Sequence, residues 1–144
     1  MSSAHDLAAY ILQKQGPLTA MKLQKLCFFS QAFSLGLFNE PLFSEEIEAW
    51  VDGPIVRALW NRHAGGHTIK QWNGNPVAIP EDKQPFIDTV LYFYGEMPAQ
   101  ELSNLTHEGQ PWLDARKGLR PNEPGSRVIS HDAMRHFYRQ SFLQ

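Results

Sequence analysis

His63 and His67 lie four residues apart, and on a helix this spacing would place both imidazoles on one face, as in a zinc site. Such a site depends on an unbroken helix and usually has a glutamate between the two ligands. Here Ala-Gly-Gly separates the histidines, and Gly65-Gly66 is typical of a helix end. We therefore predict neither a metal site nor a bound cofactor.

Ser103 and His107 lie one helical turn apart, a spacing that could bring a hydroxyl nucleophile next to a base. A working pair also needs an orienting group and oxyanion donors, and the sequence has no G-x-S-x-G turn or other nucleophile signature. His107 is better explained as a helix-end histidine that bonds to the last carbonyl groups. We predict no catalytic residues; a hydrolase using His63, His67 or His107 is the alternative.

An acidic stretch, residues 45–52, is a third candidate, because neighbouring carboxylates can divide acid and base roles. On a strand, Glu48 and Asp52 would share one face. No other polar cluster accompanies them, so we interpret them as a solvated face that can contact a basic partner. Trp72 stands in the polar loop QWNGN, which offers no apolar face to bury it. The residues predicted to bind a partner are Glu45, Glu46, Glu48, Asp52, Arg57 and Trp72.

The composition predicts one folded domain, residues 1–144, rather than a disordered chain. Hydrophobic residues make up 42% and charged residues only 19%, which is enough apolar surface for a core. No segment approaches the roughly 18 apolar residues of a membrane span, and no export signal is evident. The single cysteine, Cys27, falls in an apolar helical pattern, so we expect a small buried side chain and a cytoplasmic protein.

Charge is unevenly distributed along the chain. Residues 1–39 contain three Lys or Arg and one acid, residues 40–110 four and eleven, and residues 111–144 six and three. The middle of the chain is therefore strongly acidic within a total charge of −2. Domains that bind nucleic acid are usually clearly basic, so nucleic acid is not the favoured partner.

Two helices are predicted at the start of the chain. Ser3 and Asp6 form a capping-box pattern for a helix over about residues 3–15. Thr19 can cap a second helix, which is apolar on most sides and should be mostly buried.

These two helices and their short turn also have the spacing of a helix-turn-helix, in which Lys22 and Lys25 could contact DNA phosphates. The second helix has few polar positions left to read base edges. A buried helix is therefore the better interpretation.

Residues 47–51 alternate apolar and polar side chains, as a half-buried strand does. Gly53 permits a sharp bend, and Pro54 is predicted to begin a helix. We expect Trp50 and Trp60 to pack beside each other at this strand-to-helix corner.

The rest of the chain alternates loops and short elements. Extended pieces are predicted around Ile69 and at 77–79, helices over 86–94, 98–107 and from Pro111, a strand over 127–129, and a last helix capped by Ser130. The predicted fold class is α+β, mainly α, with about six helices and a small two- or three-stranded antiparallel sheet.

Four segments, in this order, resemble the Panacea domain family, which includes phage-associated GepA-like proteins: LTAMKLQKLCFFSQAFSL, PLFSEEIEAWVDGPIV, ELSNLTHEGQPW and VISHDAMRHFY. The resemblance extends over about residues 5–138. Two positions depart from the family pattern, since Phe28-Phe29 stands where tyrosines are frequent and Asp52 where an aromatic or basic residue is common. The motif residues, interpreted as mainly structural, are Lys22, Leu23, Lys25, Leu26, Trp50, Gly53, Pro54, Thr106, His107 and Trp112.

The resemblance implies an antitoxin-like protein, prophage or phage encoded, that neutralises a cognate toxin by direct binding and has no catalytic activity. It implies a protein partner, with a protease or chaperone as a further candidate. The alternatives are a DNA-binding autoregulator and a phage counter-defence protein.

Overall fold

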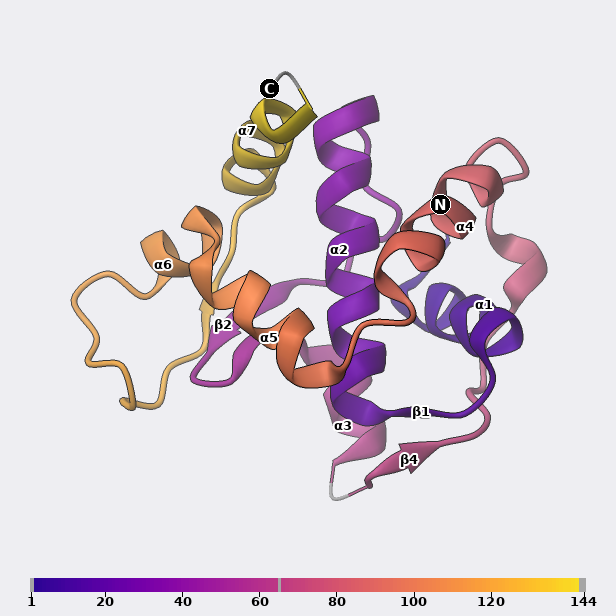
Figure 1. Ribbon diagram of the computed structural model, residues 1–144, viewed down its shortest axis with the longest axis horizontal. Helices are drawn as coiled ribbons and strands as arrows, with labels where there is room; N and C mark the ends of the chain where they lie inside the picture. The colour runs from indigo at the N-terminus through magenta and orange to yellow at the C-terminus, as the bar shows by residue number, and fades with distance from the viewer. Residues whose placement is uncertain (1, 65, 143–144) are drawn as a thin grey trace.

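The computed structural model describes residues 2–64 and 66–142, and these residues form seven α-helices, one 3₁₀ helix and five short strands (Figure 1). The helices are α1 (Ala4–Gln15), α2 (Ala20–Phe38), α3 (Arg57–His63), η1 (Pro76–Ala78), α4 (Gln84–Tyr94), α5 (Ala99–Glu108), α6 (Gln110–Ala115) and α7 (His131–Phe142). The strands are β1 (Leu18–Thr19), β2 (Ile47–Trp50), β3 (Gly53–Val56), β4 (Thr68–Ile69) and β5 (Arg127–Val128). The predicted α+β, mainly α class is confirmed, with seven α-helices in the described ranges rather than about six.

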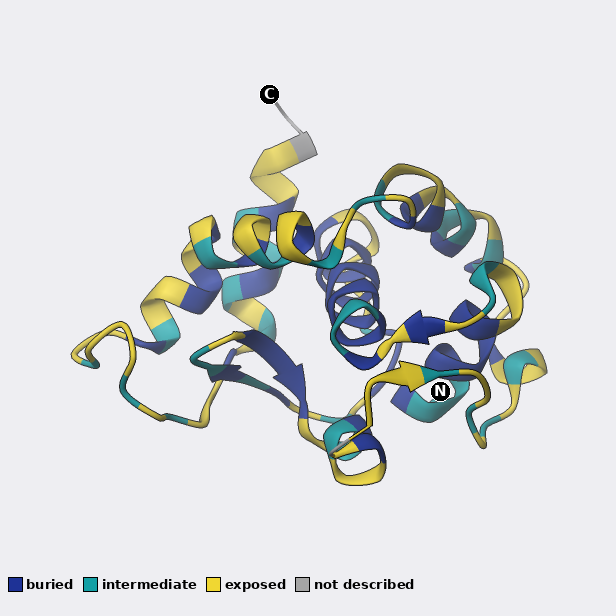
Figure 2. Cartoon of the chain, turned by 60° about the horizontal axis from the view of Figure 1, so that its bottom comes forward, coloured by how far each residue is buried: buried dark blue, intermediate teal, exposed yellow. Residues whose placement is uncertain are grey.

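Helix α2 is the centre of the molecule. Figure 1 shows it between α7 on one side and α1 and α4 on the other, and Figure 2 shows it buried along most of its length. Fifteen of its nineteen residues are buried, so it cannot present a face to a DNA groove as a recognition helix must. Gly36 brings α7 close, because a Cβ on Gly36 would lie only 2.8 Å from the backbone nitrogen of Arg139.

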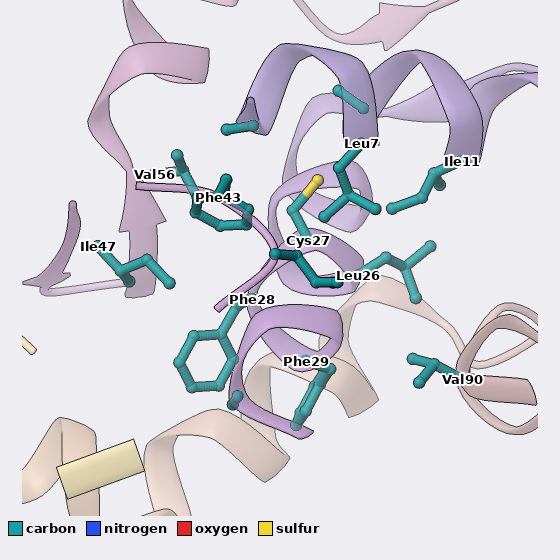
Figure 3. Close-up of a cluster of buried hydrophobic side chains, with 14 of the residues drawn as sticks. Leu7, Ile11, Leu26, Cys27, Phe28, Phe29, Phe43, Ile47, Val56 and Val90 are labelled. Carbon is teal, nitrogen blue, oxygen red and sulfur yellow. The ribbon is translucent and has the colours of Figure 1, made fainter. Parts of the chain in front are cut away.

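The hydrophobic core surrounds α2. Figure 3 shows Leu7 and Ile11 of α1 directed toward Cys27 and Leu26 of α2, with Phe43 beside them. Cys27 is a fully buried free thiol, and burial raises its pKa, because the thiolate would be poorly solvated there. The expected burial of this side chain is confirmed.

The predicted helix starts are confirmed by their caps. Ser3 and Asp6 form a reciprocal capping box at the start of α1. The hydroxyl of Thr19 accepts a hydrogen bond from the Lys22 amide at the start of α2, and that of Ser130 accepts one from Ala133 at the start of α7. Each cap satisfies an amide that has no partner within its helix.

The strand-to-helix corner predicted at Gly53-Pro54 is wrong. Residues 53–56 form strand β3, which pairs antiparallel with β2 in a hairpin, and the helix begins only at Arg57. Pro54 fits this strand because β3 is the edge of the sheet β3-β2-β5, where a missing amide donor is tolerated. Gly53 has φ +116°, a conformation that favours glycine and that reverses the chain after Asp52.

The other elements follow the predicted order. The three-stranded sheet β3-β2-β5 is antiparallel, and β1 and β4 form a separate antiparallel pair. Residues 76–78 form a 3₁₀ helix rather than an extended piece. Among the described helices, none has the length and apolar character that crossing a membrane requires.

Candidate functional site

Polar side chains from helices α2, α5 and α6 and the residue after α6 converge on the backbone of the β2–β3 hairpin. They reach carbonyl oxygens along residues 49–56, and a buried carbonyl group without a hydrogen-bond partner would be costly. We call this set the hairpin clamp; it consists of Gln24 and Lys25 from α2, Ser103 and His107 from α5, Trp112 from α6 and Arg116 just after it.

Lys25 is the most buried charge of the hairpin clamp. Its side chain is fully inaccessible to solvent, and its ammonium group donates to the carbonyl oxygen of Pro54 at 3.3 Å. Burial lowers the pKa of Lys25 to about 8, because the charged form loses its hydration, and the nearby Asp52 carboxylate opposes that shift. The motif lysine therefore supports the hairpin from inside the core.

Gly53 is the point where three of the four motif segments meet. A Cβ at this position would lie 2.7 Å from Lys25 Nζ and 3.1 Å from the hydroxyl oxygen of Thr106. Thr106 is buried and donates its hydroxyl to the Ser103 carbonyl at 2.7 Å. Glycine is therefore required here both by its positive φ and by the two side chains that close over it.

Gln24 joins the end of the hairpin to α3. Its amide oxygen accepts from the Val56 amide at 2.8 Å, and its amide nitrogen donates to the Val56 carbonyl at 3.2 Å. The same nitrogen lies 3.0 Å from His63 Nε2, which must accept and is therefore unprotonated. Burial lowers the pKa of His63, which agrees with a neutral ring.

Both ring nitrogens of His107 lie against backbone carbonyl groups, one of them in the hairpin turn. Its Nε2 lies 2.9 Å from the Val51 carbonyl and its Nδ1 lies 2.7 Å from the Ser103 carbonyl, so both ring nitrogens face backbone acceptors. The Ser103 hydroxyl is 3.4 Å from Nδ1 and also 3.4 Å from the Asp52 carbonyl. These contacts are those of a backbone support, because a base in a dyad must be free to accept the hydroxyl proton.

Trp112 and Arg116 bind carbonyl groups of strand β2. The indole nitrogen of Trp112 donates to the Trp50 carbonyl at 2.8 Å, and Arg116 donates to the Ala49 carbonyl at 3.0 Å. Arg116 is buried and also donates to the carbonyl oxygens of Arg120 and Glu123, which closes the loop after α6. Its charge is thus shared among three carbonyl dipoles instead of a carboxylate.

The histidine pair does not share a helix. Helix α3 ends at His63, with Ala64 as its C-cap; Gly65 lies outside the described residues. His67 is exposed, while His63 is buried against Gln24. Within residues 2–64 and 66–142, no group of three potential metal ligands comes together.

Two of the predicted partner-binding residues, Arg57 and Glu48, contact each other and Trp50 on the hairpin. Arg57 and Glu48 form an ion pair with 3.0 Å between Nη2 and Oε1. The same Glu48 oxygen accepts from the indole of Trp50 at 2.8 Å, and the Arg57 guanidinium lies over that indole. Trp50 also packs edge-on against Trp60, with ring centroids 5.2 Å apart, as expected.

The other predicted acidic residues differ in whether they have a partner within the chain. Glu45 accepts from the Ala4 amide at 3.0 Å and so helps to cap α1. Asp52 is exposed in the hairpin turn and acts electrostatically on Lys25. Glu46 is exposed just before β2. Of the predicted acidic face, Glu46 and Asp52 are thus the exposed members, one at each end of β2, because Glu45 and Glu48 have partners within the chain.

Trp72 is half-buried, although its loop suggested full exposure. Its indole nitrogen donates to His5 Nδ1 at 3.1 Å, its ring stacks on that of His5, and the Arg62 guanidinium lies over it. His63 contacts its edge. Burial is the main cause that lowers the pKa of His5, with Arg62 adding to the effect. Trp72 therefore joins the loop after β4 to helices α1 and α3.

Sequence reasoning missed Gln24 and Arg116 as functional positions of the hairpin clamp. Gln24 carried a signal, since it is a polar residue inside the apolar run of α2 and can be buried only with partners. Arg116 carried none, because arginine is rarely buried and its loop has no periodic pattern. Lys22, the other lysine among the family-motif residues, stays partly exposed in the first turn of α2.

Fold and contacts together define a mainly helical α+β protein whose buried polar side chains hold a short hairpin against a central helix. The chain belongs to the family described as antitoxin SocA-like, Panacea domain, because the family model matches residues 23–113. The match covers all of the hairpin clamp except Arg116. A comparison with curated proteins and one with solved structures found no match.

Proposed function

We propose that this protein is an antitoxin that neutralises a cognate protein toxin by direct binding. Membership of the antitoxin SocA-like family is the observation that carries the proposal. The contacts support it, because the residues that suggested chemistry, Ser103, His107 and His63, bond to backbone or to the Gln24 amide. The proposal therefore assigns toxin binding to side chains on the protein surface.

The acidic face is one part of that surface that a basic toxin would contact. Glu46 and Asp52 are exposed, and complementary charge across an interface speeds association and selects partners. Arg57 and Trp72, the other predicted partner-binding residues, have partners within the chain.

Co-expression tests the proposal. The product of the open reading frame next to this gene should stop growth when expressed alone, and co-expression of this chain should restore growth. A Phe43→Asp variant, which places a charge at a fully buried core position, is the control that should not restore growth. A neighbour that is harmless alone would count against an antitoxin function.

The acidic face requires a variant that leaves the fold intact. Charge reversal at Glu45 or Glu48 would remove a helix cap or an ion pair, whereas Glu46 is exposed. A Glu46→Lys variant should therefore bind the toxin more weakly at low salt and approach the wild type at high salt. If Glu46→Lys and the wild type bind the toxin equally at every salt concentration, the acidic face is not part of the interface.

A further inference from the structure

An open groove of about 660 Å³ runs along the C-terminal half of α2, away from the hairpin clamp. Its floor is a stripe of α2, Phe29, Phe33 and Leu37, spaced four residues apart and therefore on one helical face. In Figure 1 this half of α2 lies between α7 and α4, which form the two walls, and α5 closes one end.

The groove exposes side chains that are normally buried. Phe93 of α4 is 62% exposed, Leu37 of α2 46% and Leu105 of α5 38%, and all three line the groove. Apolar side chains from three helices thus line one open depression. Contiguous apolar surface of this kind marks an interaction site in a folded protein.

The charge around the groove has one sign along two of its helices. Residues 84–110, which contain α4 and α5, include four acids and no Lys or Arg. Glu108 lines the groove, and Glu101 and Leu105 lie on the same exposed face of α5, at spacings of seven and three residues from it. On the opposite wall, Arg139 of α7 donates to the Gly36 carbonyl. An occupant should therefore bring positive charge to the α5 side.

The shape of the floor fits a helix. From Phe29 to Leu37 the stripe rises about 12 Å, which corresponds to about two helical turns. An amphipathic helix with apolar residues at positions i, i+4 and i+7 presents anchors over the same length.

A second copy of this chain fits less well. In a symmetric dimer α5 could meet α7 of the second copy, but both arginines described in α7 already have partners: Arg135 pairs with Asp132, and Arg139 donates to the Gly36 carbonyl. The charge therefore favours a different, basic partner over self-association.

Building on the proposed antitoxin function, we propose that this groove binds an amphipathic helix of the toxin, with its apolar face on the exposed Leu37, Phe93 and Leu105 and a basic residue against Glu108. The interface then has an aromatic centre and an acidic rim, the arrangement of a typical specific interface.

Two matched pairs of variants test this site by titrating each purified protein with the purified product of the neighbouring reading frame. Phe93→Ser should raise the Kd at least about tenfold, because an aromatic anchor of the interface is lost. Tyr92→Ser, at the next residue of α4, should leave Kd unchanged, because Tyr92 is 78% exposed and does not line the groove. Glu108→Lys should weaken binding at low salt more than Glu46→Lys does. Thermal melting of each variant checks that the fold is intact.

The outcomes separate the two proposals. If the wild-type chain binds and all four variants bind equally well, the groove is not the docking site, while direct binding of the toxin stands. If the folded wild-type chain does not bind at all, both proposals fail. If light scattering shows a wild-type dimer that Phe93→Ser makes monomeric, a second copy occupies the groove and the proposal of a toxin helix is overturned.

Discussion

The ammonium group of Lys25 lies 3.3 Å from the carbonyl oxygen of Pro54, in a position fully closed to solvent. Within residues 2–64 and 66–142, Lys25 forms no ion pair with a carboxylate. A buried charge held mainly by a backbone dipole costs free energy. We infer that this lysine fixes the position of the hairpin at the expense of some stability.

Replacing Lys25 by methionine should remove a pH dependence of stability. The folded-state pKa is about 8 and the unfolded value 10.5, so between these values the unfolded chain holds more protons. The Lys25 contribution therefore makes the wild type more stable as pH rises from about 8, by up to about 3 kcal/mol over the full interval. Urea unfolding at about pH 7.5 and about pH 9.5 measures it. An equal pH response in Lys25→Met would contradict the assignment.

Alanine at Gly53 should destabilise the protein more than alanine at Gly118. Both glycines have positive φ, +116° and +89°, so both substitutions pay a backbone cost of about 1 kcal/mol or more. Only Gly53 is also closed over by Lys25 and Thr106, whereas the space at Gly118 is open. Thermal melting compares them. Equal losses would show that the contacts around Gly53 carry no cost.

Stability should fall as pH drops below about 6.5, through His63 and His5. Burial lowers both pKa values from 6.5. Below that pH the unfolded chain therefore binds more protons at these two histidines than the folded chain does. The stability that the two neutral histidines contribute is fully present above pH 6.5 and is lost as the pH falls toward their folded-state pKa values. Urea unfolding at about pH 7.5 and about pH 5.5 should show a smaller pH response in His63→Gln than in the wild type. The matched His67→Gln variant, at an exposed histidine, should keep the wild-type response.

Ser103→Ala and His107→Phe should separate structure from catalysis. The serine hydroxyl makes only two contacts at 3.4 Å, so its loss should cost less than about 1 kcal/mol and leave growth rescue intact. His107→Phe removes two backbone contacts and should cost about 1–3 kcal/mol. Denaturation and co-expression measure both. A stable Ser103→Ala protein that no longer rescues growth would point to a nucleophile.

Local signals in the sequence predicted the helices well. Caps such as Ser3 and Thr19 act on amides within the same turn, so their effect can be read from neighbouring residues. The hairpin could not be predicted in this way. Pro54 is equally compatible with a first helical turn and with an edge strand, and its pairing with Ala49 decides between them.

The contacts of the hairpin clamp were hidden for a related reason. Lys25 and Pro54 are 29 residues apart, and Arg116 and Ala49 are 67 apart, so only the fold brings each pair together. The motif resemblance indicated which residues matter, but it could not show that they bind backbone carbonyl groups. The partial burial of Trp72 could not be predicted from its loop either, because its partner His5 is 67 residues away.

The most direct test of the central claim is titration of the purified toxin with this protein, followed by intact mass measurement of the toxin. Neutralisation by binding predicts that toxin activity disappears only at stoichiometric amounts of this protein, in a stable complex, with the toxin mass unchanged. Inactivation by substoichiometric amounts, or a toxin whose mass has changed, would contradict the account.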